Sequence, residues 1–180
     1  SGSGKSTLPS LICGIAQPQK GVVEGDGTDL TQLSGPQHDR FRANKIGVIF
    51  QMFNLLPYAT ALENILLPLA FAPDRKSSVS DPQAEALRLT NALGLGADLV
   101  CRARASELSI GQQQRVAAAR ALIGKPRLII ADEPTSALDA ARQDDFVNLL
   151  MEQVASVGAT LVMVSHDARL ASHFDRVVDL

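Results

Sequence analysis

Three short runs of apolar residues punctuate the chain, and β-branched side chains are common in each. They cover residues 46–50, 128–131 and 160–164. Uninterrupted apolar runs of this length are typical of strands that are buried on both faces of a parallel sheet. Between the second and third runs, apolar residues recur at helical spacing, at Phe146, Leu149, Leu150, Val154 and Val157. The order strand, helix, strand predicts a parallel α/β sheet.

The remaining segments predict helices and short connections around these strands. Residues 5–15 fit a helix, residues 21–28 a short strand and turn, and residues 177–180 the start of a further strand. Residues from about 52 to 118 have a mostly helical pattern, and we expect a helical subdomain inserted in the α/β core. Within this stretch, Asp81 suits an N-cap, with Pro82 at the first position of a helix that runs to Leu93.

The composition suits one globular domain and disfavours several classes of protein. The 180 residues carry a net charge of -2, and the basic residues form no continuous run. This disfavours a protein that binds nucleic acid by neutralising phosphates. Cys13 and Cys101 lack metal-ligand spacing and indicate a reduced, cytosolic compartment. No run of about 18 or more apolar residues is present, so no membrane-spanning segment is expected.

The first seven residues, Ser1-Gly2-Ser3-Gly4-Lys5-Ser6-Thr7, match a phosphate-binding loop, G-x-x-x-x-G-K-[ST], without its first glycine. Such a loop directs backbone N–H groups and the positive end of a helix dipole at a polyphosphate. Lys5 would reach the β- and γ-phosphates, and the Ser6 hydroxyl would bind Mg²⁺. Because the loop normally follows a strand, we expect the chain to be a fragment. The alternative is a Gly/Ser linker that carries a lysine.

Two acidic residues, Asp132 and Glu133, follow the second apolar run. A carboxylate at the carboxyl end of a buried parallel strand lies beside the phosphate-binding loop in this class of sheet. Asp132 would then hold Mg²⁺ through water, and Glu133 would polarise the water that attacks the γ-phosphate. The alternative is a strand that ends in solvated acids.

Residues 108–115, Leu-Ser-Ile-Gly-Gln-Gln-Gln-Arg, form the most diagnostic motif. Ser109 and Gln112 make an S-x-x-Q capping box, which starts a helix that continues through Leu122 and leaves N–H groups free for an anion. The motif resembles the L-S-G-G-Q signature of ATP-binding-cassette (ABC) ATPases, with Ile110 in place of the first glycine and Gly111 retained. The alternative is a well-capped helix without a ligand.

Three further motifs occur in the order of the same family. Gln51 follows the first apolar run at the place of the Q-loop glutamine, residues 136–139 match the D-loop, and His166 matches the switch histidine. Asp139 also suits the cap of the next helix. Gln51 could instead be a turn residue at a strand end, and His166 a hydrogen-bonded histidine near the core. The resemblance extends over residues 1–180.

This resemblance implies an α/β P-loop NTPase with a mostly parallel sheet flanked by helices. It adds an inserted helical subdomain and a partial antiparallel β subdomain, all within one ABC ATPase domain. The substrate would be ATP with Mg²⁺ as cofactor. Glu133, His166 and Gln51 would be catalytic, and Ser6, Gln51 and Asp132 would hold the metal. The nucleotide-binding residues would be Ser1, Gly2, Ser3, Gly4, Lys5, Ser6, Thr7, Ser109, Gly111, Gln112 and Asp139.

The resemblance also implies partners. A second ATPase subunit, most simply a second copy of the chain, would pair with the first when ATP binds, and Asp139 would link the two sites. Gln51–Pro57 would dock a membrane permease subunit, although ordinary packing of this apolar stretch is the alternative.

Residues 46–51 and 54–57 most resemble the ATPase subunits of lipoprotein-release and macrolide-export systems. Such a subunit is peripheral, on the cytoplasmic face of the inner membrane, and no nucleic acid is expected. A soluble ABC ATPase that acts on nucleic acid or ribosomes is the alternative function. A degenerate cassette that only binds ATP is a third.

Overall fold

The computed structural model describes residues 7–136 and 138–179. Its strands are β1 (Glu24–Gly25), β2 (Thr28–Asp29), β3 (Ile46–Ile49), β4 (Leu128–Asp132) and β5 (Thr160–Val164). Its α-helices are α1 (Thr7–Ile12), α2 (Gly35–Lys45), α3 (Ala61–Leu66), α4 (Pro73–Ser77), α5 (Pro82–Ala92), α6 (Ala97–Arg102), α7 (Ile110–Leu122) and α8 (Ala140–Val157). Shorter 3-10 turns are η1 (Leu30–Gln32), η2 (Leu67–Ala70), η3 (Ala105–Glu107) and η4 (Ala168–His173).

The three predicted apolar runs form one parallel sheet in the order β3-β4-β5. Ile49 pairs with Ala131, which in turn pairs with Met163, so the carboxyl ends of all three strands lie at one edge. The short strands β1 and β2 pair antiparallel beside it as a separate hairpin. The predicted α/β fold class, with a parallel sheet and a small antiparallel part, is therefore confirmed.

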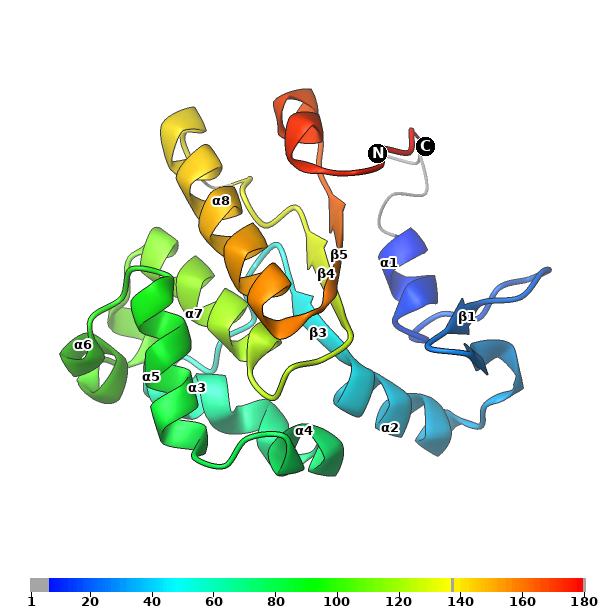
Figure 1. Ribbon diagram of the computed structural model, residues 1–180, viewed down its shortest axis with the longest axis horizontal. Helices are drawn as coiled ribbons and strands as arrows, with labels where there is room; N and C mark the ends of the chain where they lie inside the picture. Colours follow the sequence, from blue (N-terminus) through cyan, green and yellow to red (C-terminus); the bar gives the residue numbers. More distant parts are fainter. Residues whose placement is uncertain (1–6, 137, 180) are drawn as a thin grey trace.

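Helices cover the sheet on both faces, which is why its strands are apolar without alternation. On one face, Ile46 and Ile130 pack with Cys13 at the end of α1. On the other face, Ile49 and Ile129 join the large core built from α7, α8 and the helices before them. Figure 1 shows the two sides of this arrangement, with α1 and α2 on one side of the strands and α7 and α8 on the other.

The outer strand β3 lies unusually close to helix α7. A Cβ atom at Gly47 would lie 2.2 Å from the Ala121 carbonyl oxygen, so only glycine fits this crossing. Arg75, which is 4% exposed, connects β3 to the end of α7. Its guanidinium donates to carbonyl oxygens of Ile123 and Ala121 at the end of α7 and of Ile46 on β3.

Helices α3 to α7 occupy the stretch between β3 and β4, as the helical pattern predicts. Thr60 and Asp81 cap α3 and α5 through side-chain oxygens, the second as expected from the sequence. The buried side chains of these helices belong to the same hydrophobic cluster as the sheet. The boundary of a separate helical subdomain at about residues 52–118 therefore stays a prediction.

Some local predictions are wrong. The first helix ends at Ile12 rather than at residue 15, because a hydrogen-bonded turn follows, with Gly14 at a φ of 64°. Residues 177–179 form no strand, and Val177 and Val178 are 58% and 61% exposed. A strand needs a hydrogen-bonded neighbour, and no described residue pairs with this segment. Helix α2 was not expected at all. It begins with a capping box between Ser34 and Gln37.

Candidate functional site

The candidate site lies at the carboxyl edge of the parallel sheet. Each strand brings at least one of the predicted residues there. Gln51 lies just after β3, and His166 lies just after β5. Asp132 is the last residue of β4, and Glu133 comes directly after it. Parallel strands in neighbouring positions bring their carboxyl ends together, and ligands of open α/β sheets bind outside that edge. The sheet thus gathers residues that are more than 100 positions apart in the chain.

Two of the predicted residues, Glu133 and His166, contact each other at this edge. The Nε2 atom of His166 lies 3.0 Å from Oε1 of Glu133. The Glu133 side chain is only 15% exposed, whereas that of His166 is 72% exposed. The Glu133 Oε1 atom is buried and makes no hydrogen bond of good geometry. A buried carboxylate oxygen without such a bond is costly and is a common mark of a functional site.

The backbone at Glu133 is also unusual. Its φ is 47°, in the left-handed region that few residues other than glycine adopt. Its N–H donates to the Val164 carbonyl oxygen at 2.9 Å, which continues the ladder between β4 and β5 by one residue. Such strain costs about 1–3 kcal/mol and persists only where the surroundings impose it. Here it turns the carboxylate toward the end of β5.

The turn after Glu133 is held by a buried side chain of α7. Gln114, which is 1% exposed, donates from Nε2 to the Pro134 carbonyl oxygen at 2.6 Å. Ser136 N donates back to the Glu133 carbonyl oxygen at 3.2 Å. The bond from Gln114 ties helix α7, which begins at the signature motif, to the end of β4, which carries Asp132 and Glu133.

Asp132 lies close enough to Cys13 to affect the thiol. Burial raises the pKa of Cys13 to about 11, the Arg42 charge opposes this, and the Asp132 carboxylate adds to it. Packing agrees with this influence, because Ile130, two residues before Asp132 on β4, packs with Cys13 just after α1, the helix that follows the predicted phosphate-binding loop. Ser1, Gly2, Ser3, Gly4, Lys5 and Ser6 lie outside the described residues, and Thr7 is the first residue of α1.

The signature motif starts helix α7 as predicted. Ser109 and Gln112 form the expected capping box: the Gln112 Oε1 atom accepts from Ser109 N at 2.9 Å, and Ser109 Oγ accepts from Gln112 N at 3.4 Å. A Cβ at Gly111 would meet nothing within 4 Å, and its φ is not positive. Nothing inside the fold requires glycine at this position, although glycine weakens a helix by up to about 1 kcal/mol. Among the described residues, the backbone at Gly111 is therefore open.

The D-loop segment precedes helix α8. The Oδ1 atom of Asp139 accepts from Arg142 N at 3.1 Å, so the predicted helix cap is confirmed. Ala137 lies outside the described residues. Whether Asp139 also links two subunits stays a prediction.

The segment after Gln51 combines exposed and buried apolar residues. Phe53 is buried, whereas Met52 and Tyr58 are 81% and 73% exposed. Arg120 of α7 donates to the carbonyl oxygens of Phe53 and Asn54, and the φ values of these two residues are 58° and 49°. The core therefore absorbs part of this stretch, and two hydrogen bonds from Arg120 hold the turn that carries these positive φ values.

An open groove of about 310 Å³ lies beside this turn, between α2, β3, η2 and α7. Phe50 and Phe71 supply exposed aromatic surface to it, 36% and 72% exposed respectively. Arg42, Asp39 and Arg120 supply charge. The groove is thus amphipathic, and it touches the segment predicted to dock a membrane subunit.

Some residues that shape the site were not expected from the sequence. Each of four side chains makes a hydrogen bond that reaches at least 20 positions along the chain to hold a loop of the site: Gln114, Arg120, Gln143 and Arg169. Sequence spacing alone gives no signal for such contacts. Among the described residues, no group of three or more His, Cys, Asp or Glu could hold a metal ion, and no helix is long and apolar enough to span a membrane.

Comparison with known proteins shows which family the chain is similar to. The family model described as ABC transporter matches residues 1–136. The chain is 45% identical over 180 residues to the lipoprotein-releasing system ATP-binding protein LolD of Anaeromyxobacter dehalogenans, covering 100% of this chain and 74% of that protein. It is 41% identical to the macrolide export ATP-binding/permease protein MacB of Rhodopirellula baltica, covering 99% of this chain but 26% of that protein.

A solved structure gives the same result. The dimeric, post-hydrolysis structure of the ATP-binding cassette MJ0796 bound to ADP and Pi superposes with a TM-score of 0.80 at 37% identity. The match covers 94% of this chain and 73% of that one. The P-loop NTPase fold and the resemblance to lipoprotein-release and macrolide-export proteins, both expected from the sequence, are confirmed. Since the family model covers well over half of its residues, the chain belongs to the ABC transporter family.

Proposed function

We propose that this domain binds and hydrolyses ATP at the carboxyl edge of its sheet and thereby powers a membrane transporter. The observation that carries the proposal is the pair formed by Glu133 and His166, a buried carboxylate held beside an exposed imidazole at 3.0 Å. Phosphoryl transfer needs groups that position a water and stabilise charge, more than it needs covalent chemistry from the protein. Membership in the ABC transporter family supports this general function.

Glu133 is the residue that we assign to the attacking water. Its Oε1 atom is buried without a well-formed hydrogen bond, so it can accept one from a water placed at the strand end. His166, largely exposed, would point its imidazole at the γ-phosphate, and Gln51 would approach from the neighbouring strand. In this proposal, Glu133 holds the attacking water and His166 contacts the γ-phosphate.

The residues present fit a magnesium ion that arrives with the nucleotide. Mg²⁺ is usually held by one or two carboxylates together with substrate phosphates and waters, so a cluster of three acidic ligands is not needed. Asp132 would hold it, with Ser6 and Gln51. When bound, the ion neutralises charge that develops on the phosphates.

A second subunit would complete the nucleotide site. Ser109 and Ile110 are exposed at the start of α7, Ile110 by 55%, and the backbone at Gly111 is open. The free N–H groups of such a helix start favour a phosphate. We infer that Ser109, Gly111 and Gln112 of one subunit contact ATP held by another, and that Asp139 lies at the contact. The dimeric structure of the similar cassette MJ0796 supports this inference.

A membrane permease subunit would dock in the groove beside Gln51–Pro57. The aromatic surfaces of Phe50 and Phe71 suit the apolar side of a short helix, while Arg42 and Arg120 suit its polar side. Names of the relatives LolD and MacB support lipoprotein release or macrolide export as the kind of transport. The domain would then be peripheral, on the cytoplasmic face of the inner membrane.

The chemistry is tested with Glu133→Gln in the intact protein as its gene encodes it. Phosphate release from Mg-ATP should fall at least about a hundredfold, because the amide cannot accept the proton of the water. The matched control is Glu152→Gln, at an exposed glutamate of α8, which should retain the wild-type rate. Equal rates for both variants would contradict the role of Glu133.

The same variant tests the dimer. Bound ATP that is not hydrolysed should hold two subunits together, so Glu133→Gln should sediment as a dimer with saturating Mg-ATP and as a monomer without it. A protein that stays monomeric with saturating nucleotide would contradict ATP-dependent dimerisation.

A further inference from the structure

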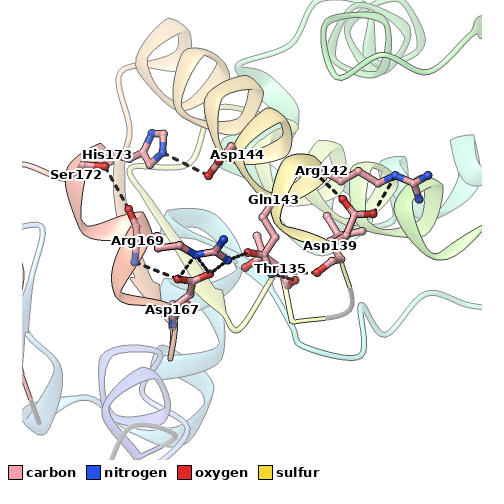
Figure 2. Close-up of polar contacts among 11 residues, drawn as sticks. Thr135, Asp139, Arg142, Gln143, Asp144, Asp167, Arg169, Ser172 and His173 are labelled. Atoms are coloured by element: carbon pink, nitrogen blue, oxygen red, sulfur yellow. Dashed lines mark hydrogen bonds and ion pairs between the residues drawn. The ribbon is translucent and has the colours of Figure 1, made fainter.

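The His166 segment and the turn after Glu133 are joined by a second route, through side chains that the family resemblance did not identify. Figure 2 shows this route, in which Arg169 lies between Asp167 on one side and Gln143 on the other. Gln143 comes from the first turn of α8, and Arg169 comes from η4, which follows β5. The two side chains meet across 26 positions of sequence, with the Arg169 Nη2 atom 3.0 Å from Gln143 Oε1.

Gln143 holds the turn that contains the D-loop. Its Nε2 atom donates to the carbonyl oxygens of Thr135 and Leu138, each at 3.1 Å. Thr135 is 2% exposed, so the first of these bonds is protected from water. Both ends of the amide are therefore used: the nitrogen binds the turn, and the oxygen accepts from Arg169. Only glutamine or asparagine offers a donor and an acceptor in this way, and only glutamine has this reach.

Arg169 holds the segment that carries His166. Its Nε atom lies 2.9 Å from Asp167 Oδ1 and 3.1 Å from Oδ2, and its Nη2 atom also binds Oδ2. Asp167 in turn caps η4 by accepting from Arg169 N at 3.0 Å, and its own N–H donates to Ser165 Oγ at 3.0 Å. These bonds fix the backbone immediately before and after His166, which is itself largely exposed.

Together these contacts close a ring. It runs from Glu133 through its turn to Gln143, then to Arg169 and Asp167, and back through His166 to Glu133. The His166 side chain contacts Glu133 and is 72% exposed, so the placement of the backbone segment that carries it contributes to where the imidazole lies. A second, weaker contact between the same elements, His173 Nε2 to Asp144 Oδ1 at 4.0 Å, lies farther along α8 and η4. Figure 2 shows both links between these two elements.

We propose that Gln143 and Arg169 are positioning residues for ATP hydrolysis, which lock the His166 segment to the D-loop turn so that His166 and Glu133 act together. Neither residue is proposed to touch the nucleotide. Because the D-loop turn would face the second subunit, the same lock would let the state of the subunit contact reach His166. This inference rests on the proposed ATPase function.

The test replaces each partner with methionine, an unbranched apolar side chain that is close in length to glutamine and shorter than arginine, and that removes the hydrogen bonds. In the intact protein, Gln143→Met and Arg169→Met should each lower kcat about tenfold, since a displacement of about 1 Å in a catalytic group has effects of this size or larger. KM for Mg-ATP should stay within twofold of the wild-type value. The double variant should be no slower than the slower single variant, because both changes break one link.

A second variant, Gln143→Glu, differs from the wild type only in that an oxygen replaces the amide nitrogen of the side chain. It keeps the contact with Arg169 as an ion pair but places a carboxylate oxygen against two carbonyl oxygens of the turn. We expect kcat to fall as in Gln143→Met. The matched control is Asn148→Asp, the same change of amide to acid at an exposed position of α8, which should keep the wild-type kcat.

Melting temperatures separate positioning from folding. Each variant should melt within a few degrees of the wild type while its kcat falls. A kcat within twofold of wild type for both methionine variants would overturn the proposal, and so would additive losses in the double variant or a change confined to KM. If the wild type hydrolyses ATP and Glu133→Gln does not, such results refute the lock alone. If Glu133→Gln is fully active, the proposed function itself fails.

Discussion

Arg75 is expected to be the most important single polar side chain for the stability of this fold. It is 4% exposed, and burial lowers its pKa to about 10, so it remains charged at neutral pH. The change that tests this role is Arg75→Met, which retains an apolar side chain of similar length. It removes the donors that pair carbonyl oxygens at the end of α7, where a helix has no partners of its own.

The size of the effect follows from the bonds that are lost. Two of them have ordinary lengths, Nε to the Ile123 oxygen at 2.9 Å and Nη2 to the Ala121 oxygen at 2.9 Å, and Nη2 also contacts the same Ile123 oxygen, which is counted once. Those to Ile46 and Arg120 are 3.4 Å long and are counted as weak. A hydrogen bond from a charged donor contributes about 1.5–3 kcal/mol, so the two good bonds contribute about 3–6 kcal/mol. Relief from burying a charge offsets part of this sum, and a net loss of about 3 kcal/mol remains.

Urea unfolding of the intact protein measures this loss. With an m-value of about 2 kcal/mol/M, a loss of about 3 kcal/mol moves the midpoint down by about 1.5 M without a change in m. The control is Arg102→Met, at an exposed arginine in the last turn of α6, with an expected change within about 0.5 kcal/mol. A loss below about 1 kcal/mol for Arg75→Met would refute the reasoning, because it would mean that water or other groups satisfy these carbonyl oxygens.

Three further residues, Gly47, Gly111 and Cys13, give testable predictions. Gly47→Ala should destabilise the fold by about 2–3 kcal/mol in urea unfolding, since the new Cβ would lie 2.2 Å from the Ala121 oxygen; an unchanged midpoint would show that α7 moves away freely. Gly111→Ala should leave stability unchanged or raise it by up to about 1 kcal/mol while weakening the ATP-dependent dimer in sedimentation; an equally strong dimer would remove Gly111 from the contact. Cys13, with its pKa raised from 9.0 to about 11, should react with iodoacetamide at pH 8 far more slowly than the exposed Cys101, as mass spectrometry of labelled peptides would show. The stabilisation from the neutral Cys13 thiol is complete below pH 9 and should be lost as the pH rises toward about 11, so a flat unfolding free energy over this window would contradict the shift.

The sheet could be predicted from the sequence because its strands are buried on both faces and appear as uninterrupted apolar runs. Helix α2 could not be found in this way. Its sequence, Gly-Pro-Gln-His-Asp-Arg-Phe-Arg-Ala-Asn-Lys, has no apolar stripe, and the signal that could have found it is the Ser34–Gln37 capping box with Pro36. The apolar pair Val177 and Val178 indicated a strand wrongly, since apolar composition alone supplies no hydrogen-bonding neighbour.

The candidate site, like the fold, could be predicted from the sequence only in part. Motif order in the sequence identified Glu133 and His166, and the sheet places them within 3.0 Å, although their assigned roles remain proposals. The contacts of Gln143 and Arg169 depend on how α8 lies beside η4, which is a property of tertiary packing. No local pattern encodes the distance between two such side chains.

The central claim is that this domain is an ATPase that drives a membrane partner. The most direct measurement is Mg-ATP hydrolysis by the intact protein, with and without a membrane permease subunit of the type named for its relatives, lipoprotein release or macrolide export. We expect that subunit to raise the rate, Glu133→Gln to abolish it, and Phe71→Glu to remove the stimulation, whereas Val22→Glu, at a valine that is 68% exposed, should keep it. A rate indifferent to the membrane subunit, but raised by nucleic acid or ribosomes, would contradict the account.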